Sequence, residues 1–141
     1  MEKIDEIYST LNDLGLDEEE ILSVKKRNKF LNIATKEDIN EIIDFFKIKC
    51  DMDKEEMALL VIENPLILNE TLERFNTLLE IYEKIGFSKK EYKEYIKKFN
   101  RAFSLNPREV NENIFELTKK GKNLEEIKSI IINKSYDMFN N

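Results

Sequence analysis

The stretch Asp17-Glu18-Glu19-Glu20-Ile21 decides the fold, because it returns three times in related form. The other copies are Asp53-Lys54-Glu55-Glu56-Met57, Ser88-Lys89-Lys90-Glu91-Tyr92 and Asn123-Leu124-Glu125-Glu126-Ile127. Each copy places a helix-capping residue three positions before a Glu, and an apolar residue follows that Glu. The copies start at residues 17, 53, 88 and 123, so they are 36, 35 and 35 residues apart. A helix start that recurs at this period predicts a helical repeat protein.

The composition fits an all-α chain that forms one domain. The 141 residues include three Gly, two Pro and no Trp, and a chain of this length can bury a core without a metal or a disulfide. The single cysteine, Cys50, excludes an internal disulfide and favours a reducing compartment, so we expect a cytoplasmic protein. One repeat away on either side its place is taken by Leu14 and Ile85, which predicts a packing role for Cys50. The acidic N-terminus has no signal-peptide pattern, and no apolar run is long enough to cross a membrane.

Each repeat is predicted to contain a helix A, a short connection and a helix B. Stacking these pairs would give a short right-handed α-solenoid of about 3.5 two-helix repeats, with a period of about 35–36 residues. We expect residues 1–141 to form a single helical-repeat domain. Its predicted parts are a leading helix at 1–14, repeats at 15–49, 50–85 and 86–121, and a terminal half repeat at 122–141.

The capping residues, prolines and glycines predict where the helices begin and end. The predicted A helices span residues 17–27, 53–63 and 88–99, and the predicted B helices span 35–49, 69–85 and 106–120. A last A helix is predicted from residue 123 to residue 141.

The apolar residues of the B helices set a register. Residues 39, 42, 43 and 46 are apolar and so are the residues 36 positions later, Phe75, Leu78, Leu79 and Tyr82, which is one face of a helix. The same step of 36 places Ile114 and Phe115 on the inner face of the third B helix, with Asn111 and Thr118 at its outer positions. The run 57–62 is apolar on all sides, so we expect helix 53–63 to be covered on both sides and to be the most buried.

The connection between helices A and B carries a family resemblance. Asn64-Pro65-Leu66-Ile67-Leu68 follows the second helix A, and Asn28 and Asn100 lie 36 residues before and after Asn64. Together with the segment from Gly86 to Tyr92, this pattern resembles the repeat of the mitochondrial transcription termination factor (mTERF) family. The resemblance implies two α-helices and a short 3₁₀ turn in each repeat, and it implies binding of duplex DNA or structured RNA. Only the second repeat has the full Asn-Pro-x-x-Leu, because Lys29 and Arg101 replace the proline and the last repeat has Ser135-Tyr136.

The sequence lacks the residues and motifs that are typical of an active site. There is no histidine, which removes the commonest general base and metal ligand. No nucleophile motif, phosphate-binding glycine loop or calcium loop appears. The acidic clusters at 17–20 and 53–56 are interpreted as helix caps that complement the helix dipole, and not as metal ligands. We therefore expect no enzyme activity, no cofactor, no metal and no small-molecule substrate.

Basic residues gather in the second half of the chain. Residues 1–85 carry 11 Lys/Arg and 21 Asp/Glu, a net charge of −10, whereas residues 86–141 carry 12 and 8, a net charge of +4. At 100° per residue, the third helix A turns its aromatic residues to the core and its lysines outward. The candidate binding residues are Lys89, Lys90, Lys93, Lys97, Lys98 and Arg101. They are interpreted either as a solvated helix face or as a ridge that binds phosphates or an acidic protein.

Three functions are compatible with these features. The favoured one is a non-catalytic interaction scaffold that binds another protein on its curved surface, as a regulator or inhibitor. The alternative is an mTERF-like nucleic-acid-binding protein that contacts phosphates through helix 89–101, which needs Lys119, Lys120 and Lys122 to share a face with that helix. A third is that the acidic half mimics nucleic acid in a partner's binding groove.

Overall fold

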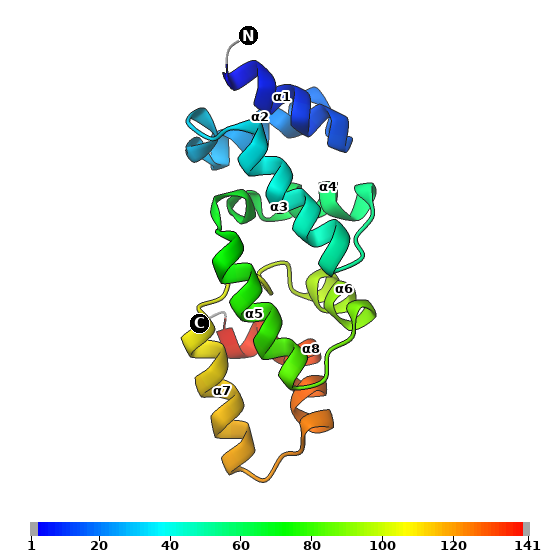
Figure 1. The fold of residues 1–141 in the computed structure, drawn as a ribbon, viewed down its shortest axis with the longest axis vertical. Helices are drawn as coiled ribbons and strands as arrows, with labels where there is room; N and C mark the ends of the chain where they lie inside the picture. Colours follow the sequence, from blue (N-terminus) through cyan, green and yellow to red (C-terminus); the bar gives the residue numbers. More distant parts are fainter. Residues whose placement is uncertain (1–2, 140–141) are drawn as a thin grey trace. The chain divides into compact units, whose positions relative to one another are not determined.

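The protein is all-helical, as predicted. In the computed structural model, residues 3–139 are described, and they form eight α-helices and two 3₁₀ helices without a strand (Figure 1). The chain divides into two compact units, residues 1–72 and 73–141. The predicted ends of the first and last helices, at 1–2 and 140–141, lie outside the described residues. Within the described part of the chain, every helix is too short or too polar to span a membrane.

The first unit contains four α-helices and both 3₁₀ helices. They are α1 (Lys3–Leu14), α2 (Glu18–Arg27), η1 (Lys29–Asn32), α3 (Lys36–Lys49), α4 (Lys54–Glu63) and η2 (Pro65–Asn69). Helix α1 packs against α3 and α4, and α2 packs against α4 and η2. The core of the unit includes the fully buried side chains of Leu11, Ile21, Ile39 and Phe46. Cys50 is also fully buried, so its predicted packing role is confirmed.

The second unit has an aromatic core. Its helices are α5 (Leu72–Lys84, which begins at the last residue of the first unit), α6 (Lys89–Lys98), α7 (Pro107–Lys119) and α8 (Leu124–Phe139). The Tyr82 ring meets the Tyr95 and Phe103 rings edge to face, with centroids 5.5 and 5.4 Å away. The Tyr82 hydroxyl donates to the Ala102 carbonyl, and the hydroxyls of Tyr95 and Ser135 share a hydrogen bond of 2.6 Å. Burial raises the pKa of Tyr95 to about 12 and raises the pKa of Tyr82 well above its ordinary value, so both phenols stay neutral.

The four recurring stretches all form the predicted helix starts. In each one the capping side chain accepts a hydrogen bond from the backbone N–H of the Glu three residues later. The side chain of that Glu accepts from the backbone N–H of the cap, and all eight distances lie between 2.8 and 3.2 Å. These capping boxes therefore fix the N-termini of α2, α4, α6 and α8.

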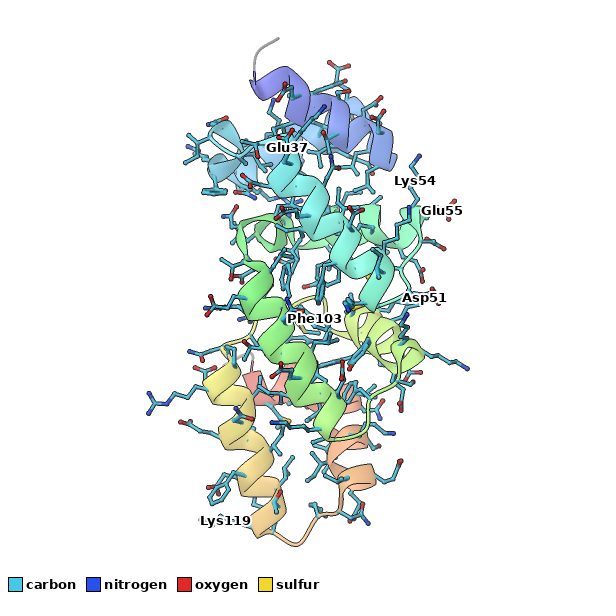
Figure 2. The ribbon with its side chains drawn as sticks, viewed as in Figure 1. Glu37, Asp51, Lys54, Glu55, Phe103 and Lys119 are labelled. Carbon is cyan, nitrogen blue, oxygen red and sulfur yellow. The ribbon has the colours of Figure 1, made fainter. Side chains whose placement is uncertain are left out.

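A residue with positive φ stands two positions before each of these caps. It is Gly15, Gly86 or Gly121 in three cases, with φ of 111°, 98° and 86°, and Asp51 in the fourth, with φ of 55°. At the glycine junctions two backbone hydrogen bonds close the preceding helix, for example Leu16 N–H to the Leu11 carbonyl and Gly15 N–H to the Asn12 carbonyl. This is the Schellman arrangement, which needs a left-handed residue. At Asp51 (Figure 2) the corresponding bond spans one more residue, from Met52 N–H to the Phe46 carbonyl.

The Asn-Pro junction of the second repeat forms as predicted. Helix α4 ends at Glu63, Asn64 is its C-cap, and Pro65 is the first residue of η2. The side chains of Ile67 and Leu68 are buried, whereas Leu66 is 54% exposed. In the first repeat Asn28 is the C-cap of α2, and its side-chain amide donates to the Pro65 carbonyl at 2.9 Å, which links η1 to η2.

The register predicted for the third repeat is wrong by one residue. A step of 36 was predicted from Asn64 to Asn100, although the caps Asp53 and Ser88 lie 35 residues apart. Phe99, and not Asn100, is the C-cap that corresponds to Asn64. The same shift places Val110 on the inner face of α7 with Ile114 and Leu117. Phe115, predicted to face inward, is 62% exposed.

Helix α4 is not covered on both sides, which corrects the prediction for helix 53–63. Met57, Leu60 and Val61 are buried, but Leu59 is 53% exposed and Ile62 is half-buried. Helix α5 buries five side chains where α4 buries three. An apolar residue on the surface carries only a small cost, so an apolar pattern alone did not require a second cover.

Besides its buried side chains, helix α8 contacts the rest of its unit through the polar contacts of Lys128. The Lys128 ammonium lies 3.1 Å from Glu91 and 3.2 Å from Glu125, and it donates to the Gly86 carbonyl at 3.3 Å. The hydrogen bonds to Glu91 and then Glu125 raise the pKa of Lys128. Partial burial works to raise the pKa of Glu91, but bonds from Ser88 and Lys128 outweigh it and lower that pKa. Both groups are therefore charged at neutral pH.

The residues with positive φ predict that two substitutions change the free energy of unfolding in opposite directions. Gly15→Ala should lower the free energy of unfolding by about 1 kcal/mol, because a Cβ at positive φ is strained. No atom lies within 4 Å of that Cβ position, so the loss comes from the backbone. Asp51→Gly should leave stability unchanged or raise it. Urea unfolding of both variants measures this, and equal losses in the two would contradict a left-handed requirement at these positions.

The Lys128 cluster predicts a pH-dependent loss of stability. Lys128→Met should lower the melting temperature at pH 7, with Lys134→Met on the same helix as the exposed control. Because the pKa of Glu91 is lowered in the folded state, its contribution is present above the ordinary value of 4.5 and is lost as the pH falls through the folded value. The difference between wild type and Lys128→Met should therefore shrink as the pH falls below 4.5. A difference that stays constant over this range would exclude the Glu91 contact as its source.

Candidate nucleic-acid interface

Helix α6 turns one face to the core and the other to solvent. Ser88 and Glu91 cap its N-terminus, and Tyr92, Tyr95 and Ile96 bury the inner face. Tyr92 and Phe87 stack with ring centroids 5.7 Å apart. The aromatic residues therefore hold the helix in place and are not available to stack on nucleic-acid bases. The lysines are left on the outer face, as the helical spacing predicted.

Four of the predicted site residues line one shallow depression on this face. Lys90, Lys93, Lys97 and Lys98 surround a volume of about 350 Å³ together with Glu94. Lys93 is half-buried and the other three are exposed. The Lys98 ammonium lies 4.0 Å from Glu94 and donates to the Asn133 side chain at 2.7 Å. We call Lys89, Lys90, Lys93, Lys97, Lys98 and Arg101 the α6 ridge; Lys89 opens the helix and Arg101 follows its C-cap, both exposed.

The start of α6 is electrostatically unlike the starts of the other A helices. Helix α2 begins with three glutamates, and α4 and α8 each have two acidic residues in the first turn. Helix α6 begins with Lys89 and Lys90 and has a single acid, Glu91. A positive charge near a helix N-terminus opposes the macrodipole by about 0.3–1 kcal/mol. Lys89 and Lys90 therefore lower the stability of helix α6.

The second basic group lies apart from the ridge. Helices α6 and α7 lie on opposite sides of α5 in Figure 1, and Lys119 projects from the far end of α7 in Figure 2. Lys119 itself lies 3.8 Å from Glu116 and over the Phe115 ring. Lys119, Lys120 and Lys122 thus do not form one continuous strip with α6.

Helix α8 instead extends the ridge, which the sequence analysis did not predict. Asn133 contacts Lys98 directly, and the exposed Lys134 follows it. Asn133 lies 35 residues after Lys98, which is one repeat period. The period alone could therefore have predicted that these two residues are neighbours.

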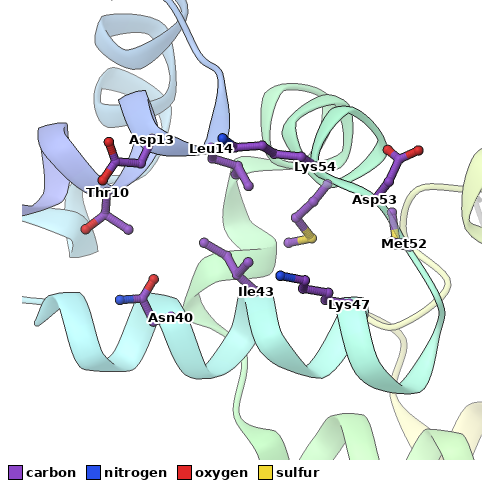
Figure 3. Close-up of a pocket in the computed structure, with 10 residues that line it drawn as sticks. Thr10, Asp13, Leu14, Asn40, Ile43, Lys47, Met52, Asp53 and Lys54 are labelled. Carbon is purple, nitrogen blue, oxygen red and sulfur yellow. The ribbon is translucent and has the colours of Figure 1, made fainter.

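A cavity in the first unit has a mixed lining. It has a volume of about 330 Å³ and lies between α1, α3 and the start of α4 (Figure 3). Leu14, Ile43 and Met57 give it an apolar floor, while Lys47 and Lys54 direct their ammonium groups into it. Its lining contains no cysteine or histidine.

The acidic clusters of the first unit serve as helix caps. Asp17 and Glu20 bond to each other's backbone N–H groups, and Asp53 and Glu56 do the same. Among residues 3–139, no group of three or more acidic, cysteine or histidine side chains is arranged to hold a metal ion.

Comparison with known proteins assigns the repeat to a family. A family model described as mTERF matches residues 1–131. A comparison with curated proteins found no match. The family match reaches from α1 to the middle of α8, and the 3₁₀ helices η1 and η2 agree with the short turn that the resemblance implied. On this evidence the chain belongs to the mTERF family.

Proposed function

We propose that the protein is a non-catalytic helical-repeat scaffold that binds nucleic acid through the phosphate contacts of the α6 ridge. Family membership carries the proposal, because the resemblance implies binding of duplex DNA or structured RNA. A protein partner is not what this family implies, so the protein-binding scaffold favoured by the sequence becomes the second candidate. The fully buried Cys50 thiol suits a reducing compartment such as the cytoplasm, which we include in the proposal.

The chemistry of the ridge favours contacts to phosphates over contacts to bases. Five of its six residues are lysines, which act as point charges and lack the bidentate geometry that reads guanine. The buried aromatic rings of α6 offer no surface for stacking. Binding should therefore be insensitive to sequence and strongly dependent on salt.

The charge of the two units favours a contact in the second one. Residues 1–72 carry nine Lys/Arg and eighteen Asp/Glu, a net charge of −9. Residues 73–141 carry fourteen and eleven, a net charge of +3. An acidic first unit repels phosphates, so the footprint should be short and centred on α6.

The proposal predicts the effect of reversing two charges in the middle of the ridge. Lys93→Glu with Lys97→Glu should weaken binding to a short duplex of DNA or RNA by at least tenfold at low salt. In wild type, log Kd should change with log salt by about 0.9 for each phosphate contacted. Fluorescence anisotropy at several salt concentrations measures both effects.

The matched control is Lys26→Glu with Lys36→Glu, two exposed residues of the first unit with the same change in charge. This control should keep most of the affinity, and circular dichroism should show that both variants remain folded. Wild type that binds neither duplex even at low salt would exclude the proposed function. An equal loss in both double variants would mean attraction by net charge alone.

A further inference from the structure

The first unit carries a groove whose charged lining is entirely acidic. The groove has a volume of about 340 Å³ and lies between η1, α3 and the residues that join η2 to α5. Asp38, Glu41 and Glu70 supply its charges, and no Lys or Arg is among its lining residues. Its apolar lining residues are Phe30, Ile42, Leu68 and Leu72, of which Phe30 is the most exposed and Ile42 and Leu68 are buried.

Each of the two 3₁₀ helices carries one exposed apolar side chain, and that of η1, Phe30, lines the groove. Phe30 in η1 is 44% exposed and Leu66 in η2 is 54% exposed, and the two residues lie one 36-residue period apart. The hydrogen bond from Asn28 to Pro65 joins the turns, and the Arg27 guanidinium donates to the Ile62 carbonyl at 2.6 Å. The two 3₁₀ helices therefore pack in register, and Phe30 and Leu66 occupy equivalent positions in them.

The corresponding position in the second unit has the opposite character. A further step of 35 residues leads from Leu66 to Arg101, which belongs to the α6 ridge. One position of the repeat thus presents apolar side chains in the acidic unit and a cation in the basic unit. The two units offer surfaces to ligands of opposite charge.

We infer that this groove is a docking site for a basic segment of a partner protein that carries a large apolar side chain. The exposed Glu41 and the capping residue Asp38 line the groove together with the exposed Phe30 ring. Carboxylates beside an apolar side chain complement lysine or arginine side chains flanking an apolar anchor. The net charge of −9 on the unit attracts such a segment and repels nucleic acid. The site is distinct from the α6 ridge and needs no nucleic acid.

The test uses the full-length chain, free of nucleic acid, and two synthetic peptides. The probe is a lysine-rich peptide of about ten residues with two leucines spaced by three positions, and its analogue has serines in place of the leucines. Isothermal titration at low salt should show the leucine peptide binding at least tenfold more tightly, because the analogue lacks the apolar anchor. Equal affinities for the two peptides would overturn the inference.

Two variants locate the site. Phe30→Ala removes apolar surface, and Glu41→Lys reverses an exposed charge in the groove. Each variant should lower the affinity for the leucine peptide by about tenfold. Glu19→Lys is the matched control, because it makes the same charge change on an exposed residue of α2 outside the groove. It should change the affinity by no more than about twofold. A loss in Glu19→Lys as large as that in Glu41→Lys would mean nonspecific attraction and would overturn the inference.

A second copy of the chain is the competing occupant, since the basic unit of one molecule could meet the acidic unit of another. Sedimentation of wild type and Glu41→Lys at low salt separates the two cases. A monomer that binds the leucine peptide supports a partner segment. A wild-type dimer that Glu41→Lys dissociates would assign the groove to self-association and overturn the inference. These variants lie outside the α6 ridge, so this test and the nucleic-acid test succeed or fail separately.

Discussion

The left-handed residue before each A helix is the constraint on which the rest of the structure depends. Gly15, Asp51, Gly86 and Gly121 each end one helix and turn the chain two residues before the cap of the next. The turn places an apolar residue such as Leu16 or Phe87 against the helix just completed, as the contact between the Phe87 and Tyr82 rings illustrates. The capping box then starts the next helix at a fixed position. Without the turn, neither the cap nor the inner face of the following helix would be in register.

The ends of the helices could be predicted because they depend on local chemistry. A capping residue and the Glu three positions later bond to each other's backbone, so the sequence alone indicates the starts of α2, α4, α6 and α8. The Asn64-Pro65 junction is local for the same reason, since proline restricts the residue before it. The inner face of α6 followed from helical periodicity, with Tyr92 and Tyr95 buried as expected.

Features that depend on neighbouring repeats were harder to predict. A repeat step of 36 instead of 35 shifted the predicted register of α7 by one residue. Phe115 was therefore predicted to face the core, whereas it is exposed. The apolar run of α4 suggested a cover on both sides, yet Leu59 is exposed, because burial depends on what packs there and not on the pattern alone. The lysines that gather on α6 were predicted, whereas the neighbouring Asn133 on α8 was not, since that contact crosses a whole repeat.

The repeat keeps one backbone frame and changes the side chains on it. The same type of helix start carries glutamates in α2 and lysines in α6, and the same position in the connection carries Phe30, Leu66 or Arg101. Because the frame is set by backbone bonds and buried residues, its surface can differ in charge from one repeat to the next. The result is an acidic unit and a basic unit within one repeat fold.

The central claim is that nucleic acid contacts the second unit through α6 and leaves the first unit free. Nuclear magnetic resonance tests it most directly, by following the backbone amide signals while a short duplex is added at low salt. The account predicts that the largest shifts occur in residues 89–101 and in the adjoining Asn133 and Lys134, with little change in α2 and α4. Largest shifts within residues 17–63, or no shifts anywhere, would contradict it.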